Sequence, residues 1–110
     1  MRTFNIAKIC RTPEERSQGA QDIIMADDDC YVFVFDSDRP HSFWGKNTFE
    51  DLWVCSIDDG YVTDVKQIIA FDLSPVMLEG KGSICIEFPV EVSVGSRIVF
   101  TGNTLAVYDA

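Results

Sequence analysis

The stretch Leu52–Ile68, LWVCSIDDGYVTDVKQI, decides the fold class. Both of its halves are rich in β-branched and aromatic residues, a composition typical of strands. Asp58-Asp59-Gly60 separates the halves, and the glycine can supply the positive φ that a tight hairpin turn needs. The stretch therefore predicts a β-hairpin with strands at residues 52–57 and 61–68.

Similar runs lie on both sides of this hairpin. Tyr31–Phe35 is apolar on both faces, which predicts a strand in the middle of a sheet. Phe43-Trp44 opens another extended segment. Further strands are expected at residues 83–88, 97–100 and 104–108. Six to eight short strands and one helix predict an α+β domain, a compact curled β-sheet or partly closed small barrel with one packed helix.

The helix signal is Thr12-Pro13-Glu14-Glu15. Thr12 can accept from the amide of Glu15 while Glu15 reaches back to the amide of Thr12, which is a capping box. Proline suits the first helical position, and early glutamates complement the helix dipole. The pattern predicts a helix that begins at Pro13 and runs to about Met25, before Asp27-Asp28-Asp29.

Length and charge limit the function classes. The 110 residues suit one domain, residues 1–110, since domains cluster at roughly 100–150 residues. The net charge is −9, and the lysines and arginines are scattered singly, so we expect neither nucleic acid nor an anionic membrane surface as a partner. Solubility alone accounts for such acidity. We expect a monomer or a weak dimer.

The chain shows no secretory leader at its first residues and no apolar run that could span a bilayer, so a cytoplasmic protein is expected. Its four cysteines, Cys10, Cys30, Cys55 and Cys85, lie far apart and form no Cys-x-x-Cys pair. Three of them sit in apolar, strand-like surroundings. We therefore expect reduced thiols that are buried as small hydrophobic side chains.

An ordered series of motifs resembles a known family. It comprises Thr12–Arg16, Val32–Phe35, Phe43–Thr48, Ser56–Gly60 and Val94–Phe100. Together, over about residues 7–100, they resemble the domain of unknown function 192 family of small bacterial and archaeal domains. The resemblance implies a compact β-rich domain with one packed helix. It implies no activity, because the family has none assigned.

The chain departs from the family pattern in several places and resembles a divergent, shortened member. The family usually has Met where Gly45 stands, and Ile-Pro-Leu-Asp where Glu50–Trp53 stand. The stretch between Gln67 and Glu87 is shorter than in the family pattern.

The best candidate site is a ligand-binding corner formed by Trp44, Lys46, Asn47 and Thr48. Trp44 could stack on a sugar or planar ring, Lys46 could pair with a carboxylate or phosphate, and Asn47 could donate and accept. Gly45 would let a ligand or another strand approach the backbone. The alternative is a structural turn in which Asn47 and Thr48 bond their own backbone and Trp44 packs in the core.

Two function classes follow. We favour a binding module that holds a small oxygen-rich ligand or a protein partner at this corner, without a cofactor. The alternative is a small enzyme that uses Lys46 or His41 with nearby carboxylates, although no nucleophile is identifiable and no catalytic residue is assigned. A metal site from His41, Asp36 and Asp38 lacks a diagnostic spacing, so no metal is expected.

Overall fold

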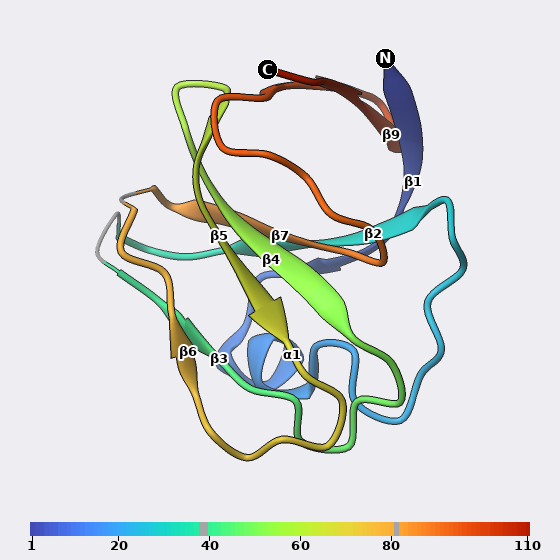
Figure 1. Ribbon diagram of the computed structural model, residues 1–110, viewed down its shortest axis with the longest axis vertical. Helices are drawn as coiled ribbons and strands as arrows, with labels where there is room; N and C mark the ends of the chain where they lie inside the picture. The colour runs from blue at the N-terminus through green and yellow to red at the C-terminus, as the bar shows by residue number, and fades with distance from the viewer. Residues whose placement is uncertain (38–39, 81) are drawn as a thin grey trace.

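A computed structural model describes residues 1–37, 40–80 and 82–110, and within them the chain forms nine strands and one helix. The elements are β1 (Arg2–Cys10), α1 (Pro13–Gln18), β2 (Asp29–Val34), β3 (Ser42–Phe43), β4 (Leu52–Asp58), β5 (Tyr61–Ile68), β6 (Val76–Met77), β7 (Ile84–Phe88), β8 (Arg97–Thr101) and β9 (Thr104–Tyr108). Seven strands close a barrel in the order β1-β2-β7-β4-β5-β8-β9, and β3 pairs with β6 (Figure 1). The described chain is therefore mainly β with one small helix, so the α+β label fits only loosely, and the barrel is closed rather than partly closed.

The predicted hairpin is confirmed. β4 and β5 are antiparallel and pair from Leu52 with Ile68 to Asp58 with Tyr61. Asp59 and Gly60 form the turn with φ values of 50° and 80°. Two successive positive φ angles match the twist of the flanking strands, which explains why this turn closes the hairpin.

The helix begins as predicted but ends earlier. The capping box is present, because the Glu15 amide donates to Thr12 Oγ1 at 3.1 Å and the Thr12 amide donates to Glu15 Oε1 at 3.0 Å. The expected end near Met25 is wrong. Gly19 takes a φ of 45° and donates its amide to the Glu15 carbonyl at 3.0 Å, which closes the helix after Gln18. α1 buries none of its six residues, so it is a short surface helix rather than the packed helix that was expected. No helix among the described residues is long and apolar enough to cross a membrane.

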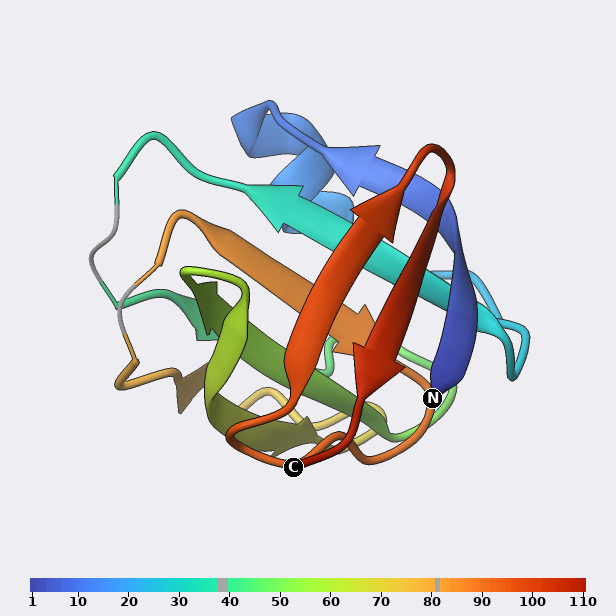
Figure 2. The same ribbon diagram turned by 90° about the horizontal axis from the view of Figure 1, so that it is seen from above.

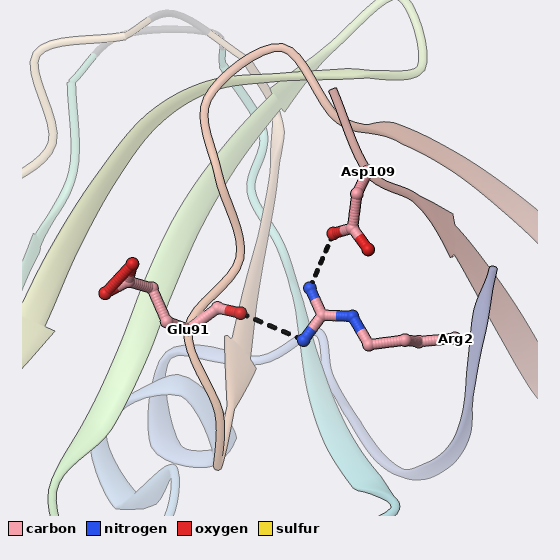
Figure 3. A network of polar contacts seen from close by, with 3 residues as sticks. All are labelled: Arg2, Glu91 and Asp109. Atoms are coloured by element: carbon pink, nitrogen blue, oxygen red, sulfur yellow. Dashed lines mark hydrogen bonds and ion pairs between the residues drawn. The ribbon is translucent and has the colours of Figure 1, made fainter.

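The first strand closes the barrel. β1 runs parallel to β2 and antiparallel to β9, and Figure 2 shows it beside both. Arg2 fastens its beginning, donating to the Glu91 carbonyl at 3.0 Å and to Asp109 Oδ1 at 2.7 Å (Figure 3). The ion pair is exposed, so it contributes at most about 1 kcal/mol. Pairing with two strands distant in sequence, rather than this ion pair, holds β1 in place.

Two hydrophobic clusters lie on opposite faces of β2, β4 and β7. The inner core receives side chains from all seven barrel strands: Phe4, Cys30, Val32, Cys55, Ile57, Val62, Ile86, Phe88, Val92, Ile98, Leu105 and Val107. The outer core lies outside the barrel wall: Cys10, Ala20, Met25, Tyr31, Phe33, Leu52, Val54, Ile68, Leu78 and Cys85. The expectation of buried thiols is confirmed, because all four cysteines are free and buried. Burial raises the thiol pKa of each, to about 12 for Cys30.

Candidate functional site

A pocket of about 740 Å³ opens beside the outer core. Its walls come from residues within 13–21, on and after α1, and within 42–48, on and after β3. Leu73 and Pro75 add a third side, and Phe35 and Glu87 complete the lining. Three segments that are distant in sequence therefore meet at one cavity.

The predicted corner lies in this lining. The Thr48 amide donates to the Gly45 carbonyl at 3.0 Å, which bends residues 45–48 into a turn. Trp44, Lys46 and Thr48 all line the pocket. The turn thus places three of the four predicted site residues at one cavity.

Asn47 has a different place. It adopts a φ of 53°, a left-handed conformation that asparagine tolerates better than most residues. Its carbonyl accepts from the Asp22 amide at 2.8 Å, its side chain is exposed, and it lies outside the pocket lining. Asn47 therefore shapes the turn that presents its neighbours.

Gly45 joins this turn to a second loop. A Cβ at Gly45 would collide with the backbone carbonyl of Ile69. The Gly45 amide donates to the Asp72 carbonyl at 2.9 Å, and the Phe71 amide donates to the Thr48 carbonyl at 3.2 Å. The close approach expected at Gly45 is therefore to the protein's own backbone, and no larger side chain fits without moving that loop.

The aromatic ring and the ammonium of the corner lie together. Lys46 Nζ is 5.4 Å from the centroid of the Trp44 ring, within the range of a cation–π contact. Trp44 is 44% exposed, so it does not pack in the core as the structural alternative required. The pair places an aromatic ring and a positive charge together at the pocket.

A second cation comes from α1. Arg16 Nη1 donates to the Val34 carbonyl at 2.9 Å and to the Arg11 carbonyl at 2.6 Å. Its guanidinium carbon lies 5.0 Å from the centroid of Phe35. These contacts fix the Arg16 side chain, which lines the pocket.

Sequence reasoning missed Glu87. It lies on β7 opposite Tyr31 of β2 and Val54 of β4, and it is only 5% exposed. Its Oε1 atom has no hydrogen-bond partner among the described residues, and the residue lines the pocket. Burial raises the pKa of its carboxyl to about 8, partly opposed by the charge of Lys8. The available signal was one acid within the apolar strand Ile84–Phe88, since glutamate is rarely buried without a reason.

His41 is not part of the pocket lining. Its ring stacks on Phe35 with 3.5 Å between centroids, and its Nε2 lies 3.3 Å from the Ser37 carbonyl oxygen. Of the possible metal ligands considered with it, Asp38 lies outside the described residues. Among residues 1–37, 40–80 and 82–110, no three histidine, cysteine, aspartate or glutamate side chains gather as a metal site. The enzyme alternative therefore retains Lys46 at the pocket, but not His41.

Comparisons with known proteins identify the family and the fold. The model of the DUF192 family, described as an uncharacterized ACR, matches residues 2–100. A crystal structure from Sinorhizobium meliloti 1021, named as a candidate transcription regulator, is 23% identical, with a TM-score of 0.75 over 90% of this chain and 78% of that chain. A protein of unknown function from Novosphingobium aromaticivorans DSM 12444 is 17% identical, with a TM-score of 0.77 over 86% of this chain and 75% of that chain. None of the curated proteins compared with the chain matches it. At these identities the two structures share the fold.

Proposed function

The chain belongs to the DUF192 family, and we propose that it is a binding module that holds a small oxygen-rich ligand in the pocket beside Trp44. One observation carries the proposal: Trp44, Lys46 and Thr48, predicted as a binding corner, line a single cavity of about 740 Å³. Pockets for small molecules occupy roughly 300–1,000 Å³ and combine apolar walls with a few placed polar groups. The size and the lining both suit a metabolite.

Different residues of the lining suit different chemical groups of such a ligand. The exposed face of Trp44 would stack on a sugar or planar ring. Lys46 and Arg16 would attract a carboxylate or phosphate. Thr48 is buried and donates its hydroxyl to the Lys46 carbonyl at 3.5 Å, so its oxygen would act as an acceptor toward the polar edge of the ligand. The ligand class supported best is therefore a ring or sugar that bears an anionic group.

The enzyme alternative retains Lys46 at the pocket and gains support from Glu87. A buried carboxyl with a pKa near 8 is suited to transferring a proton at neutral pH. A hydrolase or transferase would also need an activated nucleophile. Among the described lining residues, neither Ser17 nor Ser42 has a hydrogen bond from its hydroxyl to a base. We therefore favour binding over catalysis.

The proposal extends to partners and location. A net charge of −9 with dispersed cations favours a small molecule over nucleic acid. Four free thiols suit a reducing compartment such as the cytoplasm. We retain a monomer or weak dimer as the expected state in solution.

Thermal-shift screening of a metabolite set that contains sugar acids, sugar phosphates and aromatic acids tests the proposal. We expect at least one compound to raise the melting temperature, and Trp44→Ala and Lys46→Met each to remove that rise. Matched controls outside the pocket are Phe100→Ala, which removes a ring of nearly the same exposure (43%), and Lys66→Met; both should keep the rise. A screen without a hit, or a hit that survives Trp44→Ala, would refute the binding site.

A further inference from the structure

We infer that the ligand of this pocket is amphoteric, carrying an ammonium group that pairs with Glu87 at its buried end and an anionic group that faces Lys46. The inference rests on the proposed function, because it specifies the ligand class of the same pocket. It begins from the carboxyl group of Glu87, which is 95% buried and has an Oε1 atom without a hydrogen-bond partner among the described residues. Buried polar groups in folded proteins are nearly always bonded, so an unpartnered carboxyl oxygen on a residue that lines a pocket points to a polar partner on the occupant.

The surroundings of Glu87 supply no sufficient countercharge. From β1, Lys8 acts on it electrostatically, but Lys8 Nζ donates to the Gly19 carbonyl at 3.3 Å and lies 6.0 Å from the centroid of Tyr31. No ion pair joins Lys8 to Glu87 in the described part of the chain. The other titratable neighbours, Cys10, Tyr31 of β2 and Cys85 of β7, have raised pKa values and are neutral near pH 7. β4 places apolar Val54 opposite Glu87.

The charged groups of the pocket differ in how far they are buried. Lys46 is exposed and Arg16 is half-buried, whereas Glu87 is buried. A purely anionic ligand would satisfy the two cations and leave Glu87 unpaired. A purely cationic ligand would satisfy Glu87 and meet two like charges. A ligand with both charges, separated by a flat or apolar body that contacts Trp44, complements all of these groups.

The number of protons released on ligand binding distinguishes an ammonium ligand from other ligands. In the free pocket at pH 7, Glu87 holds a proton, because its pKa is about 8. When an ammonium group binds, the carboxyl releases that proton to solvent and forms a carboxylate–ammonium pair, without any covalent bond to the ligand. Binding at pH 7 therefore releases about one proton per ligand. A ligand oxygen that accepts from the protonated carboxyl would release none, and a carboxylate placed there would not displace the proton.

The probes are three para-substituted benzoates that differ in one group: 4-(aminomethyl)benzoate, 4-(hydroxymethyl)benzoate and 4-methylbenzoate. Isothermal titration in buffers of different ionisation enthalpy measures both affinity and protons released. We expect the aminomethyl compound to bind at least about tenfold more tightly than the other two and to release about one proton at pH 7. Its affinity should rise by about tenfold from pH 6 to pH 7, because the lower proton concentration competes less for the Glu87 carboxyl.

Glu87→Gln provides the decisive variant, since glutamine has nearly the same shape and carries no charge. It should abolish the preference for the aminomethyl compound, the proton release and the pH dependence, while its melting temperature shows that it folds. Glu91→Gln is the matched control, because Glu91 is exposed and lies outside the pocket lining, and all three properties should survive it.

The possible outcomes separate this inference from the proposed function. Equal binding of the three benzoates that is lost in Trp44→Ala would overturn the amphoteric ligand and leave the binding module standing. Absence of binding by the aminomethyl compound, proton uptake, or a preference that survives Glu87→Gln would likewise overturn the inference. In each of these cases the metabolite screen still decides whether the pocket binds a ligand of another class.

Discussion

The inner and outer cores share strands but differ in what closes them. On β7, Ile86 and Phe88 point into the inner core, whereas Cys85 and Glu87 belong to the outer side. All seven barrel strands enclose the inner core. Short elements and loops cover the outer core, among them β3 and β6 with two residues each. One strand can therefore contribute one face to a buried apolar core and the other face to the pocket.

The cover of the outer core is held by isolated backbone–backbone hydrogen bonds and by side chains that accept from backbone amides. Glu50 accepts from the Met25 amide at 2.8 Å, and Asp51 accepts from the Ala70 amide at 2.8 Å. Such bonds fasten loops at individual points, whereas a strand ladder fastens every second residue. The open pocket of about 740 Å³ lies on this loop-covered side, whereas the barrel interior is filled by the inner core.

Alanine substitutions in the two cores should have the largest effect, and they test whether the cores are equally important for stability. Phe88 and Phe33 are each fully buried, one in the inner and one in the outer core. Each change to alanine should lower the free energy of unfolding by about 4 kcal/mol, measured by urea denaturation. Phe33→Ala should also weaken binding in the pocket, because the Phe33 ring packs edge-on against Phe43, 5.3 Å away between centroids. A loss below about 1 kcal/mol for Phe33→Ala would show that the outer core is not needed for stability.

The next effect concerns the charge on the outer side. Because the folded pKa of Glu87 is about 8 and its ordinary value is 4.5, the protein should lose stability as pH rises between these values. The loss of stability approaches about 1.4 kcal/mol per pH unit. Replacing Glu87 with glutamine removes this loss, but burying the glutamine amide costs part of the stability gained. Glu87→Gln should therefore be more stable than the parent by about 3 kcal/mol at pH 8, with the difference shrinking toward pH 4.5. Urea titrations across this range measure it, and a difference independent of pH would contradict the buried charge.

The smallest of the three effects lies in the loops of the cover. Gly45→Ala introduces a Cβ against the Ile69 carbonyl and strains the hydrogen bond from residue 45 to Asp72. We expect a loss of about 2 kcal/mol, as for overpacking elsewhere, together with a weaker thermal shift by ligands. Gly102→Ala is a useful contrast: a Cβ there meets no neighbour, but the φ of 61° makes it a control for backbone strain alone. Gly45 is not among the glycines with a positive φ, so an unchanged stability in Gly45→Ala would show that the close approach to Ile69 is unimportant.

Local signals predicted local structure well. The capping box and the Asp59-Gly60 turn depend on residues close in sequence, and both are confirmed. β1 escaped prediction because its partners, β2 and β9, are brought to it by the whole topology. The helix end was misplaced because Gly19, whose φ of 45° closes the helix after Gln18, was not interpreted as a stop signal.

For the candidate site, too, the residues close together in sequence were predicted and the distant one was missed. Trp44, Lys46 and Thr48 belong to one turn, so their sequence proximity already grouped them. Glu87 reaches the pocket from a central barrel strand, and strand pairing alone brings it there. Spacing along the chain could not reveal that association, although the isolated acid in an apolar strand marked it as unusual.

The barrel is closed between β5 and β8 by a very short strand pairing. β5 pairs with β8 at one position, Tyr61 with Arg97, whereas β8 and β9 pair over five positions. The amides of Val62, Gly95 and Ile98 add backbone bonds beside that position, which concentrates the closure at one end of β5. Any transient opening of the cylinder should follow the path with the fewest bonds to break. Amide hydrogens of β5 and β8 along this edge should therefore exchange with solvent earlier than those of β2 and β7. Local opening of the native state should thus begin where β5 and β8 close the barrel.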